Sequence, residues 1–239
     1  MTMRISFALP TLLLSATLFG SCWADCVTGS GNVVRRSMTT TDYHGIQLKG
    51  ALDVQVTQGS TPSIAVEGQS NLVELVTTTV KDGMLVISTS QCYRTDKPFV
   101  VHITTPTITR VVVQGSGDVT CSGTFVMEDL EVSVMGSGDV ELTCSATRVD
   151  MSVQGSGDVK MKGRAITCTA TVTGSGDVKA GDLVCERAVA TVTGSGDVSV
   201  HATQAVKAAV TGSGSVKYRG APPQVDSDVT GSGDIIAQP

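Results

Sequence analysis

The stretch Gly115-Ser116-Gly117-Asp118-Val119 decides the fold, because it returns six more times before the C-terminus. The later copies begin at Gly136, Gly155, Gly174, Gly194, Gly212 and Gly231. Successive copies are 18 to 21 residues apart. A nearly constant period of this length is typical of a solenoid, in which each turn of chain, or rung, stacks on the one before it.

The aligned copies show which side chains point inward, since residues two apart in a strand share a face. Two residues before the first glycine, every copy has valine: Val113, Val134, Val153, Val172, Val192, Val210 and Val229. Four residues after it, every copy has valine or isoleucine: Val119, Val140, Val159, Val178, Val198, Val216 and Ile235. Alternation at one phase predicts strands with one face in a core and one in water.

The fold that this pattern favours is all-β: a three-sided parallel β-helix with rungs of about 19 residues. Equivalent residues of successive rungs would form columns with a spacing of about 4.8 Å. A helical solenoid would need longer repeats with a 3.6-residue period, which the copies lack. The glycines mark turns that require positive φ or close backbone approach.

The first 24 residues have the organisation of a secretory signal peptide. Arg4 precedes an apolar run from Ile5 to Gly20, and Ala24 suits a cleavage site. The run is too short for a stable membrane span, and we expect no transmembrane segment elsewhere. In an alternative interpretation, Cys22 is the lipidated cysteine of a bacterial lipoprotein. Export to the periplasm, the outer-membrane surface or the extracellular space is therefore expected.

Residues 25–239 are expected to form a single domain without a linker. The copies are regular over residues 111–239, whereas residues 26–110 hold irregular first rungs, beginning with the degenerate copy Gly29-Ser30-Gly31-Asn32-Val33. Turn signals separate three short strand candidates there, at residues 64–66, 84–87 and 99–103. Residues 88–98 are the most loop-like segment.

Three features together resemble a known bacterial family. They are the degenerate copy after the leader, the segment Tyr43-His44-Gly45-Ile46-Gln47-Leu48-Lys49-Gly50 and the serial Gly-Ser-Gly-Asp-Val copies. These are similar to the family described as "putative auto-transporter adhesin, head GIN domain", over roughly residues 40–236. The resemblance implies a right-handed β-helix and an envelope or extracellular location. Two departures are Ser215, which replaces the aspartate of one copy, and the lack of a translocator barrel after the repeats, so self-export is not expected.

Composition narrows the classes of partner. The chain has a net charge of −5 and no basic cluster, so nucleic acid is not an expected partner. Aromatic residues make up 3% of the chain, which leaves few platforms for stacking sugars or bases. Lys160, Lys162 and Arg164, with Lys179 nearby, form a small basic patch that we interpret as a solvated face.

Six cysteines follow the leader, and an even number in an exported chain permits disulfides. They are Cys26, Cys92, Cys121, Cys144, Cys168 and Cys185. One candidate pair, Cys121 with Cys144, would bridge adjacent rungs, and another, Cys26 with Cys92, would lie where the chain enters the stack. Cys121 and Cys168 also fall on inward-facing columns, where a free thiol behaves as a small hydrophobic side chain. No Cys/His spacing indicates zinc.

The aspartates of the repeats form the chemically most interesting column: Asp118, Asp139, Asp158, Asp177, Asp197 and Asp234. Carboxylates about 4.8 Å apart repel by roughly 0.9 kcal/mol per neighbouring pair in water. We favour a structural interpretation, in which turn amides and hydroxyls offset the repulsion. Weak calcium sites are the alternative, because calcium prefers carboxylate and carbonyl oxygens. No other cofactor is expected.

The sequence shows no catalytic constellation. The histidines His44, His102 and His201 are scattered, and the repeat serines do not occur in a GxSxG nucleophile motif. We therefore expect a non-catalytic, adhesin-like exported scaffold whose Thr- and Ser-lined faces bind a surface polymer or protein. The alternatives are an enzyme acting on envelope polysaccharide and a calcium-stabilised structural protein. The open edge of the last copy also predicts an end-to-end homodimer.

Overall fold

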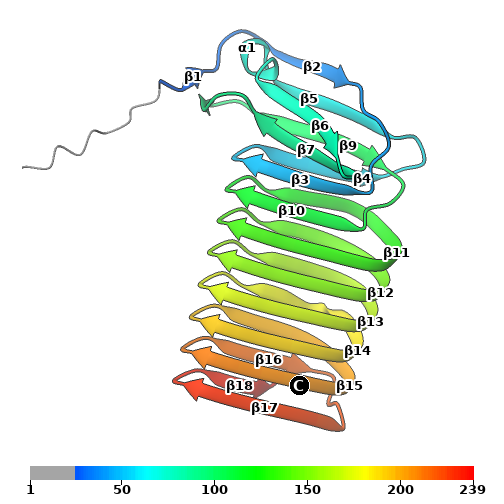
Figure 1. The fold of residues 1–239 in the computed structure, drawn as a ribbon, viewed down its shortest axis with the longest axis vertical. Coiled ribbons are helices and arrows are strands. Elements are labelled where there is room, and N and C mark those ends of the chain that lie inside the picture. Colours follow the sequence, from blue (N-terminus) through cyan, green and yellow to red (C-terminus); the bar gives the residue numbers. More distant parts are fainter. Residues whose placement is uncertain (1–24) are drawn as a thin grey trace, which may run out of the picture.

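The computed structural model describes residues 25–239. The expected signal peptide, with Cys22, lies outside them. Figure 1 shows a tall stack of strands that follows chain order from residue 110 to the C-terminal end. Within residues 25–239, no helix has the length and hydropathy needed to cross a membrane.

The repeats form a parallel β-solenoid of about seven turns with rungs near 19 residues, as predicted. Each long strand begins at or just after the aspartate of one copy and ends at the first glycine of the next copy. The regular strands are β10 (Arg110–Gly115), β11 (Val119–Gly136), β12 (Val140–Gly155), β13 (Val159–Gly174), β14 (Val178–Gly194) and β15 (Asp197–Gly212). The stack ends with β16 (Ser215–Arg219), β17 (Gln224–Gly231) and β18 (Asp234–Ala237). Each of these strands pairs with its neighbour in parallel.

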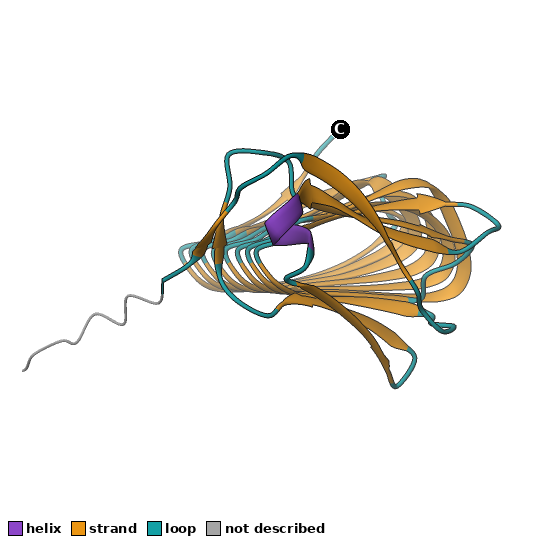
Figure 2. Cartoon of the chain, turned by 90° about the horizontal axis from the view of Figure 1, so that it is seen from above, coloured by secondary structure: helices purple, strands orange, loops and turns teal. Residues whose placement is uncertain are grey.

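The glycine turns lie above one another along one edge of the stack, where Figure 2 shows the loops superimposed. At Gly136, φ is +142°, and an added Cβ would overlap the carbonyl oxygen of Gly115 on the preceding rung. That oxygen accepts hydrogen bonds from the N–H groups of Ser137 (2.8 Å) and Gly138 (3.1 Å). The turn therefore needs glycine both for its conformation and for its close approach to the next rung.

The inward columns form the core, as the alternation predicted. The valines two residues before the first glycine are at most 1% exposed in six copies, from Val113 to Val210. Val229, the seventh, is 43% exposed, because no further rung covers it. The core is thus a continuous column of stacked aliphatic side chains that is open at β17.

The N-terminal part, residues 25–109, mixes parallel and antiparallel pairing. Its elements are β1 (Val27–Thr28), β2 (Val33–Met38), β3 (Gly45–Gly50), β4 (Asp53–Gln58), β5 (Ser63–Gln69), α1 (Ser70–Val73), β6 (Val76–Lys81), β7 (Met84–Thr89), β8 (Tyr93–Arg94) and β9 (Val100–Thr105). Strands β3 and β4 continue the stack in parallel on the N-terminal side of β10 and β11. The pairs β2–β5, β5–β9 and β6–β7 are antiparallel.

This part also closes the N-terminal end of the core. Seen from above, α1 lies over the end of the stack (Figure 2), and its Leu72 and Val73 are buried. The expected strands at residues 64–66, 84–87 and 99–103 fall on β5, β7 and β9. The short helix α1 was not expected, since four residues are too few for a recognisable helical period.

Candidate functional site

The aspartate column is a ladder of backbone hydrogen bonds. From Asp118 to Asp197, Oδ1 of each aspartate accepts the N–H of the equivalent residue on the next rung. The first of these bonds runs from the Asp139 N–H to Asp118 at 2.9 Å, and the last from the Ser215 N–H to Asp197 at 2.9 Å. Asp53 begins the ladder with the N–H of Asp118 at 3.2 Å. Because Ser215 has no carboxylate, the N–H of Asp234 instead bonds the carbonyl of Gly214 at 3.3 Å.

Lysines from the following strands offset the charge of this column. Lys179 Nζ contacts carboxylate oxygens of Asp158 and, at 3.5 Å, of Asp177. Lys217 Nζ lies 2.7 Å from Asp197. Burial alone would raise the pKa of Asp197, but Lys217 and the Ser215 N–H hold that pKa below its usual value. The geometry thus gives the column a structural role.

Two further lysines of the basic patch are also paired. Lys160 and Lys162 lie 3.1 and 2.9 Å from the Glu141 carboxylate, and their hydrogen bonds lower the pKa of Glu141. Over residues 25–239, no group of three or more His, Cys, Asp or Glu side chains is arranged to hold a metal ion. Calcium binding stays an untested alternative.

One of the two predicted disulfides is present, and the prediction of the other is wrong. Cys26 and Cys92 form a disulfide that ties β1 to the segment before β8. Cys121 and Cys144 are free and buried. A register shift between Thr120 and Thr124 is the reason, because it places Cys144 opposite Phe125 of the preceding rung.

The four free cysteines are enclosed by the core. Burial raises the pKa of Cys121 and of Cys144 to about 12. The pKa of Cys185 is also raised, through its contact with Cys168 and by burial. Cys121, Cys144 and Cys185 are therefore protonated at neutral pH, and all four buried sulfurs pack as small hydrophobic groups.

The three histidines are not brought together. His44 precedes β3, His102 lies on β9 with its Nε2 3.4 Å from Glu67, and His201 lies on β15 opposite Arg219. None of them stands beside a repeat serine in the register of the strands. The structure assembles no nucleophile with a base from these residues.

One edge of the stack carries rows of exposed hydroxyls. The threonine column lies directly before the first glycines and consists of Thr173, Thr193, Thr211 and Thr230. Strand register places these residues opposite one another on successive rungs, and all four are exposed. Two residues further along each rung lies the serine column, which is also exposed: Ser116, Ser137, Ser156, Ser175, Ser195, Ser213 and Ser232. Hydroxyls on this edge repeat about every 4.8 Å along the stack.

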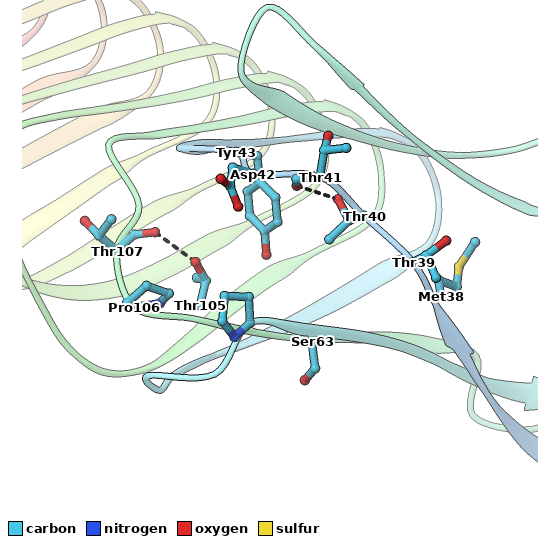
Figure 3. Close-up of a pocket in the computed structure, with 11 residues that line it drawn as sticks. Met38, Thr39, Thr40, Thr41, Asp42, Tyr43, Ser63, Thr105, Pro106 and Thr107 are labelled. Carbon is cyan, nitrogen blue, oxygen red and sulfur yellow. Dashed lines mark hydrogen bonds between the residues drawn. The ribbon is translucent and has the colours of Figure 1, made fainter.

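A pocket of about 460 Å³ lies in the N-terminal part, where three loops meet (Figure 3). Its walls come from residues 38–43 between β2 and β3, from Pro62 and Ser63 at the start of β5, and from residues 105–107 after β9. We call it the Tyr43 pocket. Its volume falls within the roughly 300–1,000 Å³ that is usual for small-ligand sites.

Tyr43 is the most unusual residue of this pocket. Its hydroxyl is buried and makes no hydrogen bond. Burial raises the pKa of Tyr43, an effect that the nearby Thr105 hydroxyl partly offsets. An unpaired buried hydroxyl costs about 1–3 kcal/mol, so this arrangement lowers stability unless another group pairs with Tyr43.

Thr105 is the second buried polar group of the pocket, at 3% exposure. Its hydroxyl donates to the carbonyl oxygen of Thr107 at 3.1 Å, as Figure 3 shows. The Thr105 oxygen keeps lone pairs that can accept a hydrogen bond. Sequence reasoning missed this pocket, because its three loops are far apart in the chain and carry no repeat motif.

Comparisons with known proteins agree on family and fold. The profile of the family described as "Putative auto-transporter adhesin, head GIN domain" matches residues 42–222. A crystal structure of a "putative adhesin" from Bacteroides fragilis NCTC 9343 is 28% identical, with a TM-score of 0.84, and covers 89% of this chain and 100% of its own. No curated protein matches the sequence.

Two structures from Parabacteroides distasonis ATCC 8503 are more distant. One, named a "putative lipid binding protein", is 25% identical, with a TM-score of 0.73, and covers 89% of this chain and 99% of its own. The other, named a "putative adhesin", is 24% identical, with a TM-score of 0.72, and covers 90% of this chain and 100% of its own. At this identity, the second structure supports the similarity in fold alone.

Proposed function

Because the chain belongs to the "putative auto-transporter adhesin, head GIN domain" family, we propose that it is an exported, non-catalytic scaffold that binds an extended polysaccharide of the cell envelope. The family and its relatives carry adhesin names, which accords with a surface or exported binding protein. The scaffold holds its surface groups rigidly, because every rung is fixed by the backbone bonds of its neighbours.

The observation that carries the proposal is the row of exposed hydroxyls along the glycine edge. A hydroxyl both donates and accepts hydrogen bonds, so the threonine and serine columns can pair with a polymer that is rich in hydroxyls. Their spacing of about 4.8 Å is similar to the length of one sugar in an extended polysaccharide. A polymer lying along the stack would meet an equivalent set of groups at each rung.

The strand face that carries the lysines, which follows the aspartate next to each turn, is less suited to this role. Its cations, Lys160, Lys179 and Lys217, are each engaged by carboxylates of the same face. Binding a polymer there would require these ion pairs to be broken or desolvated, which opposes binding. The hydroxyl edge has no such cost.

The test is retention of the purified protein on insoluble envelope polysaccharide, measured by co-sedimentation. We expect the double variant Thr193→Val/Thr211→Val to bind about tenfold or more weakly, since two hydrogen bonds are lost. Thr120→Val, which changes an exposed threonine outside this column, is the matched control and should bind as the wild type does. Equal retention of all three proteins would refute a role for the threonine column.

A second experiment decides where the protein meets its ligand. Intact cells are treated with an external protease, and the remaining protein is measured before and after the outer membrane is opened. Loss from intact cells supports a surface adhesin. Protection until the membrane is opened supports a periplasmic binding protein, whereas recovery from the cytoplasm with residues 1–24 still attached contradicts export.

The alternative function, an enzyme that cleaves envelope polysaccharide, has weaker support. Such an enzyme needs an acid and a base on one exposed face, together with groups that bind the sugars. The carboxylates from Asp118 to Asp197 accept backbone hydrogen bonds, and three of them also contact lysines. Release of shorter saccharides during the co-sedimentation experiment would favour the enzyme.

A further inference from the structure

The Tyr43 pocket has the attributes of a ligand site that is separate from the threonine column. It lies among β2, β3, β5 and β9, several rungs from the threonines of β13 to β17. Its three walls meet at loops, where binding groups in proteins commonly lie. The phenol of Tyr43 points into the space between the loops in Figure 3.

The polar groups of the pocket are hydroxyls. Tyr43 offers a buried hydroxyl without a partner, and the nearly fully buried Thr105 offers lone pairs beside it. The remaining hydroxyls of the lining belong to Thr39, Thr40, Thr41, Ser63 and Thr107. The Thr40 and Thr105 hydroxyls donate to nearby carbonyl oxygens, but an apolar ligand would leave the Tyr43 hydroxyl without a hydrogen bond and remove water from the exposed ones, and this loss would oppose its binding.

The charges of the pocket exclude a second class of ligand. Asp42 is the only charged residue of the lining, and no lysine, arginine or histidine contributes to it. A phosphate or carboxylate ligand would therefore meet a like charge and no counter-ion. The apolar part of the lining is small and consists of Met38, Pro62 and Pro106 with the ring of Tyr43.

We propose that the Tyr43 pocket binds a neutral, polyhydroxylated ligand of the size of one or two sugar units. The ligand accepts a hydrogen bond from the Tyr43 hydroxyl and donates one to Thr105. Its C–H groups contact Pro62, Pro106 and the Tyr43 ring. The inference concerns a different part of the molecule from the proposed polymer contact and does not depend on it.

The test uses NMR of the full chain titrated with D-glucose, N-acetyl-D-glucosamine, maltose and D-glucuronate at millimolar concentrations. We expect at least one neutral sugar to shift the amide signals of residues 38–43 and 105–107, and glucuronate to do so less. Tyr43→Phe should weaken binding about five- to tenfold, because it removes one hydrogen bond. Thr120→Val changes an exposed threonine outside both the pocket and the threonine column, so it should leave this binding unchanged.

The stability of Tyr43→Phe separates a binding role from a structural one. The phenylalanine fills the same space without an unpaired hydroxyl, so its melting temperature should equal or exceed that of the wild type. Weaker sugar binding together with undiminished stability supports the proposal. Thr105→Val removes the other hydroxyl that the proposal uses. It serves as a second variant in case Tyr43→Phe folds poorly, and it should likewise weaken sugar binding.

Three outcomes would overturn the inference. They are the absence of shifts in the pocket with every neutral sugar, equal sugar affinities of the wild type and Tyr43→Phe, and binding of decanoate micelles at the pocket in preference to the sugars. The last outcome would indicate a lipid site. If Thr193→Val/Thr211→Val loses polysaccharide binding while sugars still shift the pocket signals, the two sites are separate, as the proposal requires.

Discussion

Asp197 combines two roles in one side chain. Its Oδ1 accepts the backbone N–H of Ser215 at 2.9 Å, and its Oδ2 contacts the ammonium of Lys217 at 2.7 Å. The first interaction joins two rungs, whereas the second compensates charge. Because the aspartate is partly exposed, the hydrogen bond matters more for stability than the ion pair does.

Two substitutions should separate these roles. Asp197→Asn keeps an acceptor for the Ser215 N–H and should cost less than about 1 kcal/mol at pH 7. Asp197→Ala removes that acceptor as well and should cost about 1–2 kcal/mol more. Urea denaturation at pH 7 measures both, and equal losses would contradict the structural role of the acceptor.

The pH dependence follows from the lowered pKa of Asp197. A carboxylate whose pKa is lower in the folded state contributes stability above its unfolded pKa and loses it as pH falls through the folded pKa. The wild type should therefore lose stability relative to Asp197→Asn below about pH 4. If the stabilities of the two proteins change with pH in the same way, Asp197 does not contribute to the pH dependence of folding.

At the scale of the element, the glycine turn determines how closely rungs stack. Each first glycine has positive φ and lies against the carbonyl of the glycine one rung earlier. The turn could be predicted from sequence, because seven equivalent copies all report the same backbone requirement. The register shift near Thr120 could not be placed in this way. The spacing of 21 residues between Gly115 and Gly136 shows that this rung is longer than most, but not where along the strand the extra residues lie.

Gly155→Ala should destabilise the protein by at least about 2 kcal/mol, because it combines a disfavoured φ with overlap of the Gly136 carbonyl. Gly181→Ala is the matched control. Gly181 lacks positive φ, and its nearest neighbouring atom would lie 3.8 Å from the new Cβ. Thermal unfolding should show a change of less than about 1 kcal/mol for this control. Similar effects of both substitutions would contradict the account of the turn.

The N-terminal elements were harder to predict than the rungs. Strand positions there followed from local alternation, but their antiparallel pairing and the helix α1 depend on contacts between distant segments. The Tyr43 pocket arises from the same contacts. Residues such as Tyr43 and Thr105 belong to no column, so no other copy indicates what they do.

At the scale of the whole molecule, stability should vary along the stack. Each rung contacts mainly its neighbours, so the ends can loosen while the middle stays folded. The Cys26–Cys92 disulfide ties down the N-terminal end and closes a loop with a sequence separation of 66. The C-terminal end has no comparable cross-link within residues 25–239, and its core-facing Val225 and Val229 are exposed.

Cys26→Ser/Cys92→Ser should lower stability by about 2–4 kcal/mol. Hydrogen exchange should show faster exchange in β1, β8 and α1 and little change in β12 to β15.

The four buried thiols should react with an alkylating reagent only after denaturation, which peptide mapping of the wild type would show. Labelling of Cys121 or Cys144 in the native protein would contradict their enclosure.

The exposed last rung leads us to expect end-to-end association of two copies through β17. Its outer edge is unpaired, and Val225 and Val229 would be covered by a second molecule. Asp226 and Asp228 on the same strand oppose this contact by charge repulsion, so the dimer should strengthen as salt increases. Sedimentation velocity tests this, with Val229→Lys as the variant that should remain monomeric. A monomer at high concentration in all salt conditions would refute the contact.

Binding without catalysis is the central claim, and one incubation tests it most directly. Purified protein is mixed with polysaccharide from the envelope of the producing cell, and both bound protein and soluble saccharide products are measured over time. The account predicts that the protein is retained and the polysaccharide stays chemically unchanged. Release of shorter saccharides, or failure of the protein to bind any fraction of the polysaccharide, would contradict it.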